Sequence, residues 1–286
     1  MMWIIYALLT AVFTSLKSVA SKKSLRSLDA FVISWFIFFF SGVFLSLFFL
    51  KADIPELSNY FWIILFLDCL PSALAAVMSI KALESDMSAS VPMTAFTPLF
   101  MLLTGWLMLG EVPDAFGLAG VILIVAGVYI LNIRERKNGW RAPFSALVKH
   151  EGPRLMLGAS LIWSITGILD KIAVQNSSPL FFAMAENILI ALFIFPFAYK
   201  RIKQQKKEIG KEKIHLIAVI ILSALVVYCQ MIAISQALVV YVIAIKRFSI
   251  VIAILLGGVV FKEKDIRLKL VGGIVMVLGV MLITLF

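Results

Sequence analysis

Long apolar runs, separated by short polar segments, occupy almost the whole chain. A helix needs about 20 predominantly apolar residues to cross the hydrocarbon core of a bilayer, and ten stretches come close to that length. The predicted spans are residues 3–21, 29–50, 59–81, 89–109, 115–133, 154–174, 179–199, 214–236, 238–261 and 268–286. This pattern predicts an all-α integral membrane protein with ten transmembrane helices.

The composition agrees with a lipid environment. Of the 286 residues, 62% are hydrophobic and only 15% are charged, which leaves too little polar surface for a soluble domain of this size. Cys69 and Cys229 each lie inside an apolar run, so the sequence predicts neither a disulfide framework nor a metal site. The formal net charge of +10 comes from basic residues in short segments between the runs, which excludes a nucleic-acid-binding face.

These basic residues predict the orientation. Of the 26 Lys and Arg residues, 21 lie in the first, third, fifth, seventh and ninth loops and 2 lie in the other loops, while Lys17, Lys246 and Arg247 lie within spans. Because basic loops stay in the cytoplasm, we expect a multi-pass protein of the plasma membrane with both termini extracellular.

The two halves of the chain resemble each other. Gly117–Val128 aligns with Lys269–Val280 at an offset of 152, with six identical positions. The same offset pairs Glu111 with Glu263, each just after a span. Matches in a shared order and register indicate an internal duplication.

A duplicated unit of five helices must enter the membrane upside down the second time, because five is odd. The sequence therefore predicts a first five-helix repeat at 1–134, a basic cytoplasmic linker at 135–153 and a second repeat at 154–286. Inverted repeats place a substrate site near mid-membrane, where the two halves meet. This arrangement favours a secondary transporter.

Two motifs resemble EamA-like proteins of the drug/metabolite transporter superfamily. Trp163–Lys171 resembles the tryptophan-to-lysine opening of each repeat in that family, and Pro98–Glu111, followed by a glycine-bearing helix, resembles the closing pattern. The resemblance implies alternating access and a central cavity lined by helices 1, 3, 4, 6, 8 and 9. Ile250 and Leu9 depart from the family pattern, and the proline at 98 alone predicts a break in helix 4 with a more regular helix 9.

Lys246 and Arg247 are the main candidates for substrate binding. They lie about eight residues into the ninth span, where a charge costs about 2.5 to 3.5 kcal/mol on insertion scales. Adjacent residues point about 100° apart on a helix, so we expect one to face the cavity and the other to pair with a neighbour. Tyr228 followed by this pair resembles the sugar-phosphate and nucleotide-sugar branches of the superfamily, in which such residues hold the substrate phosphate.

Glu186 and Asp68 lie at comparable depth in the seventh and third spans. Three interpretations stay open: structural pairing with Lys246 and Arg247, transfer of a coupling proton by a buried carboxyl group, or an exchange between the two.

Other polar or small residues carry weaker predictions. Trp163, Tyr228 and Gln230 are further substrate-binding candidates near mid-span. Lys17, Asp170 and Lys171 are interpreted as anchors at the membrane interface, and Glu111 and Glu263 as loop caps. Four glycines predict close contact between helices 5 and 10, namely Gly120, Gly127, Gly272 and Gly279.

Taken with the fold, these residues predict a secondary active transporter of a small anionic or zwitterionic metabolite. An alternative is a proton-coupled exporter of amino acids or drugs. The only histidines, His150 and His215, lie in or beside basic loops, which disfavours an intramembrane enzyme. The sequence has no glycine-rich loop of the kind that binds phosphate, so we do not expect ATP to be the energy source. We expect no cofactor, and we expect a monomer whose partners are the lipid bilayer, a small metabolite and, in the alternative, protons.

Overall fold

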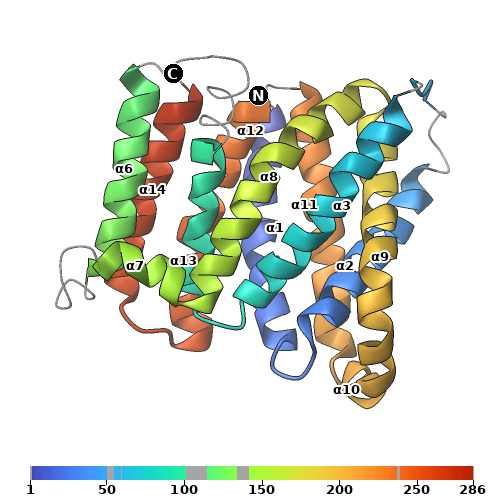
Figure 1. The fold of residues 1–286 in the computed structure, drawn as a ribbon, viewed down its shortest axis with the longest axis horizontal. Coiled ribbons are helices and arrows are strands. Elements are labelled where there is room, and N and C mark those ends of the chain that lie inside the picture. Colours follow the sequence, from blue (N-terminus) through green and yellow to red (C-terminus); the bar gives the residue numbers. More distant parts are fainter. Residues whose placement is uncertain are drawn as a thin grey trace.

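The computed structural model describes residues 2–49, 55–58, 60–100, 115–133, 142–236 and 239–285. These residues form helices joined by short turns, and none of them is in a β-strand (Figure 1).

Six helices are long and apolar enough to cross a membrane. They are α1 (Met2–Ser24), α2 (Ala30–Phe49), α3 (Phe61–Ala82), α8 (Glu151–Gln175), α9 (Pro179–Gln204) and α11 (Lys213–Gln236). Many of their large apolar side chains face outward, such as Trp62 at 57% exposure and Leu192 at 60%. Such a surface requires lipid, so the chain is a multi-pass membrane protein.

Shorter elements complete the chain. They are α4 (Met87–Ser90), the 3-10 helix η1 (Val91–Ala95), α6 (Ala115–Leu131), α7 (Ala142–Lys149), α10 (Lys206–Lys211), α12 (Val239–Lys246), α13 (Phe248–Phe261) and α14 (Ile266–Leu285).

Helical geometry is interrupted in both halves. The chain changes from α4 to η1 at Val91, beside Pro92 and seven residues before Pro98, where a break was expected. The ninth predicted span is also broken, because α12 ends at Lys246 and α13 begins at Phe248. The interruption is a single residue, Arg247, against five residues of 3-10 helix in the described part of the fourth span, so helix 9 is the more regular of the two, as predicted, although it is not continuous. The backbone tightens there without a proline, since the Ile250 N–H donates to the Arg247 carbonyl, three residues back, at 2.9 Å.

Serine hydroxyl groups from neighbouring helices bond to the backbone at both breaks. Ser160 of α8 donates to the Met93 carbonyl at 3.1 Å, and Ser15 of α1 donates to the Ser249 carbonyl at 3.0 Å. Irregular backbone at membrane depth is tolerated where such partners satisfy it.

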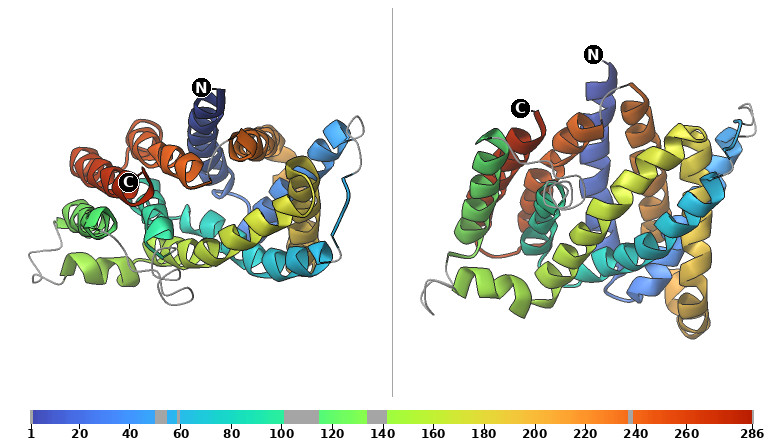
Figure 2. Two further views of the ribbon diagram at one scale, coloured as in Figure 1. Left: turned by 90° about the horizontal axis from the view of Figure 1, so that it is seen from above. Right: turned by 45° about the horizontal axis from the view of Figure 1, so that its top comes forward.

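Four pairs of helices make the most extensive contacts: α1 with α11, α3 with α8, α2 with α9, and α6 with α14. The α6–α14 pair stands at one end of the elongated molecule and α2–α9 at the other (Figures 1 and 2). Each pair joins an element before the 142–149 helix to one after it, so the two halves interlock and do not form separate bundles.

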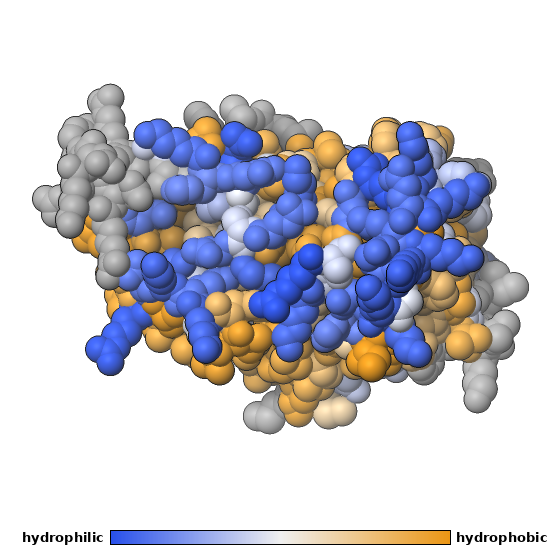
Figure 3. Space-filling model, turned by 90° about the horizontal axis from the view of Figure 1, so that it is seen from below, coloured by the Kyte–Doolittle hydropathy of each residue, from blue (hydrophilic) through white to orange (hydrophobic). Residues whose placement is uncertain are grey.

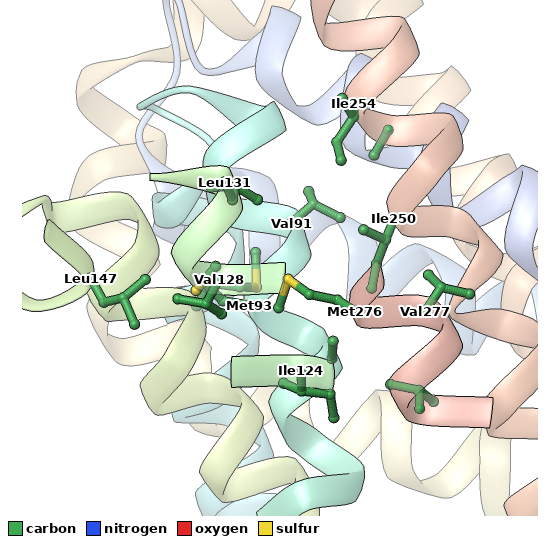
Figure 4. Close-up of a cluster of buried hydrophobic side chains, with 14 of the residues drawn as sticks. Val91, Met93, Ile124, Val128, Leu131, Leu147, Ile250, Ile254, Met276 and Val277 are labelled. Atoms are coloured by element: carbon green, nitrogen blue, oxygen red, sulfur yellow. The ribbon is translucent and has the colours of Figure 1, made fainter. Parts of the chain in front are cut away.

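The α6–α14 pair is held together by glycine. A Cβ atom added to Gly272 would lie 2.7 Å from the Gly127 carbonyl oxygen, and one added to Gly279 would lie 2.6 Å from the Gly120 carbonyl oxygen. The backbones therefore approach more closely than any side chain allows, which confirms the predicted packing seam. Beside it, apolar residues of η1, α6, α13 and α14 form a buried cluster that includes Ile124, Ile250 and Met276 (Figure 4).

The end of the molecule opposite the termini is hydrophilic. Both termini lie at the upper end, and α10 lies at the lower end (Figure 1). Seen from below, the molecule presents a nearly continuous hydrophilic face (Figure 3). The basic residues at the end of α1, Lys22 and Lys23, belong to this end.

Candidate functional site

A cavity of about 280 Å³ opens between the two halves of the protein. Residues of α1, α3, η1, α8, α11, α12 and α13 line it, together with residues of α2 and α9. Its charged lining residues are Lys17, Asp170, Glu186, Lys246 and Arg247. A charge-lined hollow inside an apolar protein is the strongest candidate for a binding site in the described part of the chain.

Lys246 lies at the last position of α12, where the helix stops. Its Nζ donates to the Gln230 Oε1 of α11 at 2.6 Å. Trp163 of α8 lines the same cavity. The structure thus brings together three of the residues that the sequence singled out.

Arg247 occupies the turn between α12 and α13, and it too lines the cavity. Its side chain is 8% exposed and its Nε has no hydrogen-bond partner. One member of the Lys246–Arg247 pair was expected to face the cavity, but both do. Arg247 keeps helical dihedral angles (φ −67°, ψ −13°), so a separation of about 100° between adjacent residues does not keep one of them out of this cavity.

Lys17 and Asp170 also line the cavity, which corrects their interpretation as interface anchors. Helix α1 continues to Ser24, so Lys17 lies seven residues, or about 10 Å, from its end. The sequence did contain an indication, because Lys17 shares a polar stripe with Thr14, Ser18 and Ser21 at helical spacing. The side chain of Lys171 is outside the described part of the structure.

Asp68, Asp170 and Glu186 form an acidic cluster contributed by α3, α8 and α9. One carboxylate oxygen of each lies within 4.8 Å of the other two, and this is the one group of three potential metal ligands among the described residues. Asp68 is fully buried, and neither of its carboxylate oxygens has a hydrogen-bond partner.

The predicted pairing of these acids with Lys246 or Arg247 is not seen as direct contact. Among the described residues, no ion pair within 4.0 Å joins them. Lys246 is nevertheless near enough to interact electrostatically with Asp170 and Glu186. The acids and bases therefore face one cavity without closing on each other.

Tyr228 lies elsewhere. It is 39% exposed and lines a small apolar hollow of about 90 Å³ with Leu45, Pro179 and Met231. Tyr228 and Gln230 are two positions apart on α11, which turns them about 200° from each other. Since Gln230 faces the cavity, Tyr228 faces away from it.

Glu263, in the turn between α13 and α14, joins three parts of the chain. Its carboxylate accepts hydrogen bonds from the Lys22 Nζ and from the Met87 and Ser88 backbone N–H groups, each at 2.8 Å. The last two begin α4, so the predicted role as a cap is confirmed. Burial alone raises the pKa of Glu263, but the hydrogen bonds from Lys22 and Ser88 outweigh it and lower that pKa overall. Glu111 is outside the described residues.

Comparison with known proteins agrees with this architecture. The sequence model of the EamA-like transporter family matches residues 1–133 and 151–285. Fourteen chains of solved structures match as well. One of them, titled "Crystal structure of protein", is 14% identical, with a TM-score of 0.69 over 99% of this chain and 96% of that chain, a likeness that concerns the fold alone. No curated protein matches.

The family match covers both halves of the chain and the elements that enclose the charged cavity. We conclude that the protein belongs to the EamA-like transporter family of the drug/metabolite transporter superfamily and is a membrane transporter.

Proposed function

We propose that the protein is a monomeric secondary transporter of a small metabolite with an anionic group, either a free anion or a zwitterion, and that it works by alternating access. The observation that carries the proposal is the position of Lys246 and Arg247. Both line an intramembrane cavity, and neither is neutralised by a carboxylate within 4.0 Å among the described residues.

The helix pairing supports ten helices in two inverted repeats. In such a duplication each element of the first half has a counterpart in the second: α1 corresponds to α8, α2 to α9, α3 to α11, α4–η1 to α12–α13, and α6 to α14. When each element is replaced by its counterpart, the α1–α11 pair becomes the α8–α3 pair. This replacement leaves the α2–α9 and α6–α14 pairs unchanged. It also exchanges the two serine contacts, from α1 to the second broken helix and from α8 to the first. A substrate site between such repeats is suited to rocking of one half against the other.

The chemistry of the site supports an anionic group. Arg offers a planar fork of donors that matches carboxylate and phosphate, and Lys adds a compact charge. The cavity volume, about 280 Å³, is at the lower end of the roughly 300 to 1,000 Å³ that is typical of ligand pockets. A small metabolite fits this volume better than a nucleotide sugar does.

The test begins with a ligand screen. A ligand that binds the folded state alone raises the apparent stability of the purified protein, so a metabolite panel is scored by the melting temperature. The binding isotherm of the best ligand is then measured for wild type, Arg247→Gln and Lys246→Gln. Loss of a charge-assisted hydrogen bond costs about 1.5 to 3 kcal/mol, so we expect binding to weaken about tenfold to more than a hundredfold in each variant.

Arg267→Gln is the matched control. It removes the same charged group from an exposed position near the start of α14, and it should leave the affinity unchanged. If the two cavity variants fold and bind as wild type does, the charges are structural and the anionic-substrate proposal fails.

The acidic cluster supports a second candidate function, a proton-coupled exporter of amino acids or drugs. In that case Glu186 or Asp68 carries the coupling proton in the direction opposite to that of the substrate. Stabilisation by cationic drugs, or by amino acids whose affinity is unchanged in Arg247→Gln and Lys246→Gln, favours this candidate.

A further inference from the structure

The charges around the cavity balance one another. Lys17, Lys246 and Arg247 line it, and so do Asp170 and Glu186, behind which Asp68 is buried. With all of these groups ionised, the three positive and three negative charges of the described lining sum to zero. A bound monoanion would leave one uncompensated negative charge in a medium where such a charge is costly.

The acidic cluster has the means to take up the compensating positive charge. Neither oxygen of Asp68 has a donor, one oxygen of Asp170 has none, and an oxygen of Asp68 lies within 4.8 Å of one from Asp170 and one from Glu186. Asp68 is 0% exposed and is not among the residues that line the cavity. A proton fits the cluster as the structure has it, because it needs no space beyond the carboxylate oxygens that already lie near one another.

Lys246 connects the cluster to the anion site. Its ammonium group donates to the neutral Gln230 and acts electrostatically on Asp170 and Glu186. Few other titratable groups face the cluster. Cys69 of α3 donates its thiol to the Glu186 carbonyl at 3.8 Å, Lys17 and Arg247 lie along the same cavity, and α2 carries no charged residue.

We propose that the substrate anion and a proton bind together, the anion at Lys246 and Arg247 and the proton at the Asp68–Asp170–Glu186 cluster. This inference rests on the proposed function, because it needs an anion at Lys246. When the anion engages the ammonium group, the cluster loses part of the counter-charge that Lys246 supplies. A proton from solvent then bonds to one carboxylate oxygen and is shared with its neighbour, so the loaded site returns to neutrality.

Co-binding has a defined sign. Because coupling between two ligands is reciprocal, protons must strengthen anion binding as much as the anion strengthens proton binding. For one linked proton, affinity rises by up to about tenfold for each unit of decrease in pH. Anion and proton then cross the membrane in the same direction, in contrast to exchange of a proton for the substrate.

The experiment uses the purified full chain and sulfate as the anion, because sulfate does not change its own protonation near neutral pH. A pH indicator in weakly buffered solution measures the protons exchanged when sulfate binds, and isotherms are recorded from neutral to mildly acidic pH. Sulfate is a dianion, so full neutrality of the loaded site requires two protons. We expect uptake of about one to two protons per bound sulfate and tighter binding at lower pH. Release of protons, or binding that is independent of pH, overturns the proposal.

Variants locate the proton. Asp68→Asn and Asp170→Asn should still bind sulfate, but proton uptake and the pH dependence should disappear. Glu151→Gln, which changes an exposed carboxylate at the start of α8, is the control and should behave as wild type. If both Asn variants keep the full proton uptake, the cluster is not the proton site.

A second measurement does not depend on the anion. Infrared difference spectra between neutral and mildly acidic pH report the protonation of buried carboxyl groups. Exposed carboxyl groups do not contribute in this range, because they titrate at a lower pH, near about 4. We expect the absorption of a protonated carboxyl group in wild type and its loss in Asp68→Asn. The spectra are recorded both without and with sulfate. If sulfate binds and the absorption is absent in both conditions, the proposal is overturned. Failure of wild type to bind sulfate, with the absorption present, counts against the anion contact and so against the proposed function.

Discussion

At the scale of single residues, the buried charges fall into two kinds. Glu263 is satisfied, because Lys22 and two backbone N–H groups surround its carboxylate. Arg247 and Asp68 keep atoms without partners in an apolar protein. A buried polar group without a partner is costly, so the second kind indicates positions that a ligand or a proton completes.

Glu263 should stabilise the fold in a pH-dependent way. We expect Glu263→Gln to lower the free energy of unfolding at neutral pH by about 1.5 to 3 kcal/mol, because hydrogen bonds to a charged acceptor are weakened. The pKa of Glu263 is lowered in the folded protein, so its contribution is present above the unfolded pKa of about 4.3 and disappears as the pH falls through the folded value.

Thermal unfolding of wild type and variant across this pH range measures the difference. The two curves should converge at low pH. Glu151→Gln is the control, since its pair with Lys81 is exposed on both sides and should contribute little. A constant difference between wild type and Glu263→Gln at every pH contradicts the assignment.

At the scale of elements, close helix contact and broken helices have different roles. The α6–α14 seam is built from backbone against backbone, so it has no room to adjust. The α12–α13 segment differs, because its helix is interrupted where Arg247 meets the cavity. Helix α14 of the rigid seam and the irregular α12–α13 segment therefore both belong to the second half of the chain.

The seam predicts a large effect from one methyl group. Gly272→Ala should destabilise the protein by about 1 to 3 kcal/mol, because the added Cβ atom meets the Gly127 carbonyl and Leu131 with no flexible side chain to move aside. Gly210→Ala is the matched control, since nothing lies within 4 Å of its added Cβ atom. Within a helix that change should be neutral or slightly stabilising. Equal melting temperatures for the two variants would argue against the seam.

At the scale of the whole molecule, polarity is distributed along the direction of crossing. The sides of the helices expose apolar residues, while the end opposite the termini is hydrophilic (Figure 3). Basic residues that stay on the cytoplasmic side orient a membrane protein. The hydrophilic end is accordingly the one that we place in the cytoplasm.

This orientation predicts that both termini are extracellular. A reporter that is active only outside the cytoplasm should be active when fused to the C-terminus, and one that works only in the cytoplasm should be silent there. The same two reporters inserted in α10, within Lys206–Lys211, should give the opposite pattern and serve as the internal control. A C-terminal fusion that is active only in the cytoplasm reverses the assignment.

Much of the candidate site could be predicted from the sequence. Lys246, Arg247, Gln230, Trp163 and Glu186 were selected by their depth in apolar runs, and the structure brings all five to one cavity. Depth is a property of position along the chain, and the cost of placing a charge in lipid depends chiefly on depth.

Rotation about the helix axis could not be predicted in this way. Tyr228 has the right depth but faces away, and Asp170 and Lys17, placed near span ends, face the cavity.

The sequence by itself determined the membrane environment, the family resemblance and the glycine seam. Each depends on local composition or on spacing along the chain, which a linear pattern records. Only the tertiary structure decided that three acids from α3, α8 and α9 meet, and that no carboxylate of the described chain closes on Lys246. The reason is that such contacts depend on which helices are neighbours and how each is turned, and packing between distant segments sets both.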